Sequence, residues 1–251
     1  MTLIVENNVP GERIALGLVV VENVIVGRGD LSLDDEIAAL VERRAEALDD
    51  GEDAIRRACR DMLRNGRYKP TGRGKPASEY LLREASRGEF PRVLDPVDAL
   101  NLVSLAHLVP ISLWDLDKAA VAAGREPAAG SIYDGDERFE VRLGRSGERY
   151  VFNSADQLLE LEDLVVGCAL TAGGESVPLW TPIKDGMRSK IDASTRRVAA
   201  CIYYPIEAGE RAHLETITAE LHRWLDACRP DGGGAARAAH ALAMPHETAT
   251  L

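Results

Sequence analysis

The chain is poor in aromatic residues and cysteine and has no long apolar run. Aromatics make up 5% of its 251 residues, and the four cysteines stand far apart without a C-x-x-C pair: Cys59, Cys168, Cys201 and Cys228. This spacing argues against a disulfide framework and a zinc site, so we expect buried thiols and neither metal nor cofactor. No segment approaches 18 uninterrupted apolar residues, and the first residues lack the pattern of a signal peptide. We therefore expect no membrane span and a cytoplasmic location.

The signatures of several large enzyme classes are also missing. The sequence has no G-x-G-x-x-G, no Walker A loop, no H-E-x-x-H and no G-x-S-x-G. None of its five histidines is spaced as a metal pair with a nearby cysteine or carboxylate. Any catalytic site must therefore be built from less conspicuous residues.

Charge is unevenly distributed along the chain. The net charge of −11 argues against DNA binding and against coating nucleic acid by bulk charge. However, residues 28–53 hold ten acids and three bases, whereas residues 56–75 hold eight bases and one acid. A polyanion can therefore be met locally at the basic segment, and the acidic segment is a candidate partner surface.

The apolar pattern predicts one α+β domain over residues 1–228 with a mixed β-sheet. The apolar run 14–21 is typical of a buried strand, Ser32 and Asp35 form a candidate capping box, and Asp95 with Pro96 forms a candidate helix start. We expect helices near 33–48, 52–65, 77–87, 95–107 and 207–228, a hairpin joining 139–143 to 149–152, and strands at 165–171, 176–180 and 198–204. The Gly- and Ala-rich stretch 229–251 is expected to be a disordered tail.

One segment is similar to a known family. The run from Phe90 to Leu105 contains V-D-x-x-N at 97–101 and continues into V-P-I-S-L-W-D-L-D-K at 109–118. It resembles the B3/4 domain, the editing domain of the phenylalanyl-tRNA synthetase β subunit, and more closely the solo B3/4 proteins. The segment from Arg188 to Thr195 is similar to the family's final loop. The resemblance spans about residues 10–210.

The resemblance implies a B3/4 fold and hydrolysis of an amino acid from a mischarged tRNA. An aminoacyl ester is already activated, so such a site needs mainly to position water and to stabilise an oxyanion. Asn101 matches the family Asn of the amino-acid pocket. Ser112 stands where the family has His, Trp114 where it has Phe, Ala106 where it has Glu, and Met187 near a family acidic residue. The resemblance thus implies Asn101 and Ser112 as catalytic candidates, with substrate-binding candidates Asn101, Ser104, Trp114, Asp115 and Met187.

The basic segment supplies candidates for phosphate or RNA binding. Arginines 56, 60 and 64 share a helix face and most simply form a solvated surface, but the Gly/Pro-rich loop after them carries four more cations. The candidates are Arg64, Arg67, Lys69, Arg73 and Lys75. We expect an aminoacyl-tRNA trans-editing hydrolase. Two alternatives stay open: a repurposed pocket that binds or transforms a free aromatic amino acid, for example by condensing it with a phosphorylated small molecule, and a non-catalytic module that binds tRNA or a synthetase.

Overall fold

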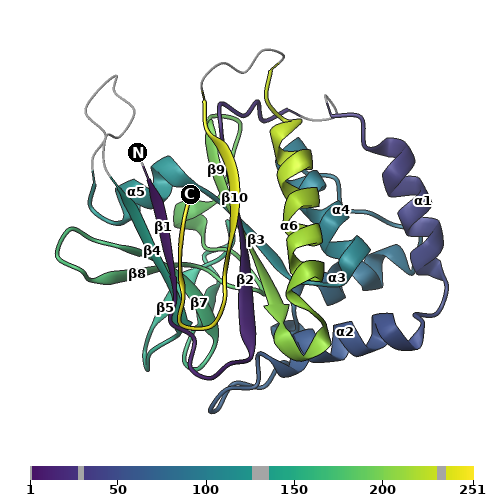
Figure 1. Cartoon of the computed structure of the whole chain (residues 1–251), viewed down its shortest axis with the longest axis horizontal. Coiled ribbons are helices and arrows are strands. Elements are labelled where there is room, and N and C mark those ends of the chain that lie inside the picture. Colours follow the sequence, from purple (N-terminus) through teal and green to yellow (C-terminus); the bar gives the residue numbers. More distant parts are fainter. Residues whose placement is uncertain (1, 28–30, 126–135, 231–235) are drawn as a thin grey trace.

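A four-stranded antiparallel sheet lies at the centre of the molecule (Figure 1). The computed structural model describes residues 2–27, 31–125, 136–230 and 236–251. The strand order is β10 (Ala238–Ala243), β2 (Ile14–Glu22), β9 (Arg197–Pro205) and β3 (Ile111–Asp115). All nine residues of β9 are buried, as are the first eight of β2. The prediction of a buried strand at 14–21 is therefore confirmed.

A five-stranded mixed sheet packs against one face of this central sheet. Its order is β11 (Thr248–Thr250), β1 (Leu3–Asn7), β4 (Glu137–Leu143), β7 (Val165–Leu170) and β8 (Ser176–Trp180), and only the β1–β4 pair is parallel. A short pair, β5 (Arg149–Val151) and β6 (Leu158–Glu160), stands beside it. The expected strands at 165–171, 176–180 and 198–204 are confirmed as β7, β8 and β9.

The opposite face of the central sheet is covered by helices (Figure 1). The described residues form α1 (Asp34–Ala45), α2 (Asp50–Asp61), α3 (Ala77–Ala85), α4 (Asp95–His107), α5 (Leu116–Ala122) and α6 (Arg211–Asp226). Helix α5 lies apart from the others, on the side of the five-stranded sheet, where it contacts β7 (Figure 1). Helix α6 packs on β2 and β10, and α4 packs on α6. Gly17 of β2 lets α6 approach, because a Cβ there would overlap Thr218. The chain is thus one α+β domain, and none of its described helices is both long and apolar enough to cross a membrane.

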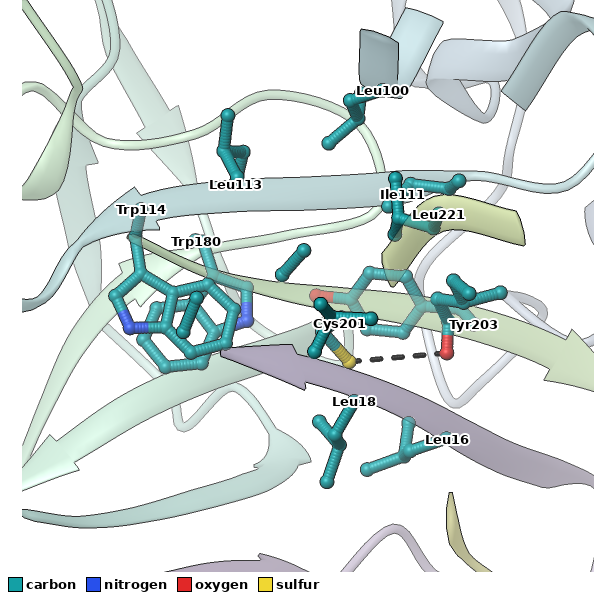
Figure 2. Packing of buried hydrophobic residues seen from close by; sticks show 14 of the residues in the cluster. Leu16, Leu18, Leu100, Ile111, Leu113, Trp114, Trp180, Cys201, Tyr203 and Leu221 are labelled. Carbon is teal, nitrogen blue, oxygen red and sulfur yellow. Dashed lines mark hydrogen bonds between the residues drawn. The ribbon is translucent and has the colours of Figure 1, made fainter. Parts of the chain in front are cut away.

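Stacked indole rings join the two sheets. Trp114 of β3 and Trp180 of β8 are fully buried and parallel (Figure 2). Phe139 of β4 contacts both rings. Gly167 makes room for this stack, because a Cβ at that position would overlap the Trp180 indole. All four cysteines are buried and free, as the sequence predicts.

Two predicted helix starts differ from the structure. Helix α1 begins at Asp34 after Leu33 with no side-chain cap, so the capping box proposed at Ser32 is wrong. A capping box occurs instead at α2, where Asp49 and Glu52 bond to each other's backbone N–H. Helix α4 contains Asp95 as its first residue and has Leu94 at its N-cap. The Asp95 carboxylate turns away to accept a hydrogen bond from the Leu31 N–H.

The predicted hairpin between 139–143 and 149–152 is wrong. Strand β4 pairs with β1 and β7, whereas β5 pairs with β6. The turn residues 144–148 are consistent with a hairpin, but the neighbour of β4 is decided by burial. Strand β7 is almost entirely apolar and buried, and it offers β4 a longer apolar surface than the three-residue β5 does.

The predicted disordered tail is wrong for residues 238–243 and 248–250, while 231–235 lie outside the described residues. Strand β10 pairs antiparallel with β2 over six residues, and β11 pairs with β1. Alanine has low β propensity, but its small side chain fits beside α6, and β10 covers the edge of the most buried strands. The domain therefore extends to the C-terminal strand and does not stop at residue 228.

Candidate functional site

A cleft of about 1260 Å³ lies between the helical layer and the edge of the central sheet. Its walls come from the C-terminal part of α1, from α2, from α3 with the turn before it, from α4, and from Ile111 of β3. Ile183 and Lys184, which follow β8, close one side. The sequence-predicted residues that line this cleft are Asn101, Ser104, Arg73 and Lys75.

Helix α4 holds Asn101 and Ser104 on its cleft face, since they are three residues apart. Ser104 is buried and donates to the carbonyl of Val109 at 2.7 Å, so its hydroxyl hydrogen is committed to the end of the helix. Asn101 is half-buried, and no hydrogen bond from another described residue engages its amide. The Asn101 amide is therefore available to a ligand as both donor and acceptor.

Interactions at both ends of α4 fix its position. At the N-terminal end, the buried Asp98 carboxylate accepts from the Val93 N–H at 2.7 Å and from Arg92 at 2.9 Å. At the C-terminal end, the buried Arg44 guanidinium donates to the carbonyls of Leu105 and Ala106. The two bonds from Arg44 satisfy carbonyls at the end of α4 that have no partner within the helix. Because both ends of α4 are held, Asn101 is carried on a rigid element.

Cationic side chains outnumber acidic ones in the cleft. Six cations line it, Arg44, Arg56, Arg73, Lys75, Arg83 and Lys184, against the two acids Glu46 and Glu79. Three of the cations are paired: Arg44 with Glu52, Arg56 with Asp53 and Glu79, and Arg83 with Glu84.

The other three, Arg73, Lys75 and Lys184, meet no acidic partner in the described part of the chain. Lys184 Nζ lies 4.0 Å from the centre of the Phe152 ring. Burial, and secondly the nearby charge of Arg73, lower the pKa of the Lys184 amine. A cleft with three uncompensated cations in a chain of net charge −11 is suited to an anionic ligand.

Hydrogen bonds from residues of β3 and β5 fix the loop that carries Lys184. The Ser112 hydroxyl donates to the Thr181 carbonyl at 2.9 Å, and the Thr181 and Tyr150 hydroxyls both donate to the Lys184 carbonyl. Asp185 accepts from the Leu113 N–H at 3.3 Å, while its other carboxylate oxygen is buried without a partner. Burial raises the pKa of Asp185 to about 6.

Ser112 and Trp114 do not line this cleft, and the prediction that they share a pocket with Asn101 is wrong. Residues 111–115 form strand β3, in which successive side chains point to opposite faces. Ile111 reaches the cleft, whereas Trp114 points toward the interior between the sheets and stacks on Trp180 (Figure 2). Ser112 is buried as well. The Ser112 hydroxyl bonds to Thr181 and contacts the Tyr203 hydroxyl, so it is enclosed by protein.

Asp115 and Met187 also lie outside the cleft lining. Asp115 is buried and caps α5, where its carboxylate accepts from the Lys118 N–H and from the Thr195 hydroxyl. Met187 is 38% exposed on a 3₁₀ turn after Gly186. Neither residue reaches the cleft from its position, so the substrate-binding roles predicted for them are not compatible with this cleft.

The basic segment is divided by the fold. Arg73 and Lys75 line the cleft, but Arg64 pairs with Asp61 and Arg67 lies 86% exposed near Glu162. Lys69 is exposed and is not part of the lining. RNA binding by Arg64, Arg67 and Lys69 stays a prediction from the sequence. These three residues lie outside the cleft, so any such binding site is separate from it.

Sequence reasoning missed Lys184 and Tyr80, which both line the cleft. Lys184 is brought there from a loop far along the chain, and no local motif marks it. Tyr80 carries a weak signal, because it lies off the buried stripe of α3 formed by Ser78, Leu81 and Ala85. An aromatic residue on the polar face of a short helix is unusual in a chain with so few aromatics.

Within the described ranges, no group of three or more His, Cys, Asp or Glu side chains is arranged to hold a metal ion. Comparison with family models and with curated proteins finds no match for this chain.

Proposed function

We propose that this chain is a B3/4-type protein whose cleft binds the aminoacylated end of a tRNA and hydrolyses the ester. The single observation that carries this proposal is the meeting of Asn101 with Arg73, Lys75 and Lys184 in one cleft. Asn101 belongs to the V-D-x-x-N pattern, and the three cations supply the charge that neighbouring phosphates require.

The size of the cleft favours a substrate larger than a free amino acid. Pockets for small ligands measure about 300–1,000 Å³, whereas this cleft measures about 1260 Å³. An aminoacyl group joined to a nucleotide uses this extra volume, and its phosphate uses the cations. A free amino acid leaves most of this volume empty and offers the three cations a single carboxylate.

The proposed chemistry requires positioning more than strong acid–base catalysis. Water adds to the ester carbonyl carbon, the bond to the ribose oxygen breaks, and that oxygen takes the proton released by the water. The Asn101 amide donates to the carbonyl oxygen as negative charge develops on it, while the cations fix the nucleotide. Ser112 takes no part in this step, since it is enclosed between the sheets.

Deacylation of tRNAs charged with each of the twenty amino acids tests the proposal. We expect one or a few to lose their amino acid faster than the spontaneous rate, and Asn101→Ala to abolish most of the difference. Asn8→Ala is the matched control, because Asn8 is exposed directly after β1 and does not line the cleft. No acceleration with any charged tRNA contradicts the proposal, and tRNA binding without acceleration indicates a non-catalytic binding module.

A further inference from the structure

An exposed aromatic ring stands on the wall of the cationic cleft. Tyr80 of α3 is 52% exposed and lines the cleft, as does Val93, which is 46% exposed. Exposed apolar side chains that adjoin a groove are a feature of ligand-binding surfaces, whereas single ones elsewhere on a surface are ordinary. The fold has no structural need for Tyr80, because α3 is anchored through Leu81 and Ala85.

The ring is held in place from one side. The Arg83 guanidinium lies over the Tyr80 ring, 4.9 Å from its centre, and Arg83 pairs with Glu84 at 2.9 Å. Tyr80 and Arg83 are three residues apart on one helix, so their contact follows from helix geometry. A planar ligand can then stack on the opposite face of the ring.

The ligand that fits both features is a nucleotide. Nucleotides combine an aromatic base with a phosphate, and proteins hold single-stranded nucleic acid by pairing aromatic platforms with cations that track the backbone. Here the platform is Tyr80, and the unpaired cations are Arg73, Lys75 and Lys184. A sugar phosphate has no aromatic base for the ring, and a free amino acid has no phosphate for the three cations.

We propose that Tyr80, supported by Arg83 and flanked by Val93, is the stacking platform for the terminal nucleoside of the tRNA. This inference deepens the proposed function and rests on it for the identity of the nucleic acid. It separates two tasks within the cleft: Tyr80 recognises the base, and Arg73, Lys75 and Lys184 neutralise phosphate.

Fluorescence of 2-aminopurine ribonucleoside 5′-monophosphate tests the platform without any hydrolysis, since stacking quenches this base. We expect saturable quenching with the wild type, retained in Tyr80→Phe because the π-face remains. Tyr80→Ala should remove the quenching and weaken affinity about 5- to 150-fold, the range expected for one stacked base. Val121→Ala is the matched control, because Val121 is 56% exposed and lines a different, smaller pocket.

A second arm measures KM for deacylation of the charged tRNA and of the ethyl ester of the same amino acid. Tyr80→Ala should raise KM for the tRNA and leave that for the ethyl ester unchanged. Quenching that depends on Tyr80 without hydrolysis of any charged tRNA would support the platform and overturn the proposed function. Hydrolysis with quenching and KM both unaffected by Tyr80→Ala would overturn the platform alone.

Discussion

The indole rings of Trp114 and Trp180 lie parallel with their centres 3.8 Å apart, and this stack joins the edge strand β3 to the edge strand β8. Both rings are fully buried. The stack fixes the strand that ends the central sheet, and with it the position of Ile111 in the cleft.

Replacing Trp114 should act mainly on stability, because the ring itself does not line the cleft. We expect Trp114→Ala to lower the free energy of unfolding by about 3–5 kcal/mol, with a smaller loss for Trp114→Phe. Urea unfolding measures the change, and tRNA binding by the fraction that remains folded is the second readout. If Trp114→Ala kept full stability but lost tRNA binding, Trp114 would belong to the binding site.

The cleft cations should carry the electrostatic part of tRNA binding. Replacing Arg73, Lys75 and Lys184 together by Ala should weaken binding and reduce the slope of log affinity against log salt by about 2, since each lost contact with a single strand removes about 0.7. The matched variant replaces Arg64, Arg67 and Lys69, which lie outside the cleft. Equal reductions in both variants would favour the whole basic segment over the cleft.

Asn101 and Ser104 should separate function from stability. We expect Asn101→Ala to lower kcat/KM for deacylation about 100- to 1,000-fold through the loss of a hydrogen bond to developing charge, with little change in stability. Ser104→Ala should lose about 1 kcal/mol of stability, because its hydroxyl bonds to the Val109 carbonyl, and should retain most activity. Steady-state kinetics together with thermal melts check both results, and the reverse pattern would place Ser104 in the chemistry.

Asp185 should make stability depend on pH. Its pKa in the folded chain is raised to about 6 by burial, so the folded state holds the proton more tightly than the unfolded state does. The cost of ionising it is absent below about pH 4, grows as pH rises, and is complete above about pH 6, where it reaches roughly 3 kcal/mol. Asp185→Asn keeps an oxygen for the Leu113 N–H, and it should therefore raise Tm at pH 7.5 but not at pH 4.

Asp192→Asn is the opposite control for that experiment. A hydrogen bond from Lys118, followed by those from Ser194, holds the pKa of Asp192 below its usual value. Its contribution is stabilising at neutral pH and is lost as pH falls through the folded pKa, so this variant should lower Tm at pH 7.5. A rise in Tm for both variants would contradict the assignment to Asp185.

Because β10 pairs with β2 over six residues, we expect the C-terminal region to contribute to stability. The backbone N–H groups of neighbouring residues in an edge strand point alternately to the partner strand and to solvent. Proline at one of the two positions Ala241 and Leu242 therefore removes a bond to β2, whereas proline at the other does not. We expect one of Ala241→Pro and Leu242→Pro to lower the free energy of unfolding by roughly 1–3 kcal/mol more than the other. If both variants are as stable as the wild type, β10 does not contribute to stability, and the prediction of a disordered C-terminal tail would hold.

The residues that could be read from the sequence are those whose partners are close along the chain. Helix α4 and the buried strand β2 follow from local periodicity, and so does the placement of Asn101 and Ser104 on one face. Pairing partners do not follow, because β4 has the sequence of half a hairpin yet joins β1 and β7. Long-range burial decides this choice.

The site was predicted in part for the same reason. Residues 111–115 follow the Asn-bearing helix closely along the chain, and in a turn all their side chains could face one hollow. As strand β3 they alternate, which sends Ser112 and Trp114 to the interior. Lys184 could not be found at all, because only the fold brings its loop to the helices.

Ser112 has an indirect connection to the cleft. Its hydroxyl bonds to the Thr181 carbonyl, and the Thr181 hydroxyl bonds in turn to the carbonyl of Lys184. We expect a change in the tightly packed space between the sheets to shift the backbone of Lys184, whose side chain lies on the cleft wall. Variation at a residue that never meets the ligand can in this way tune how firmly the ligand is held.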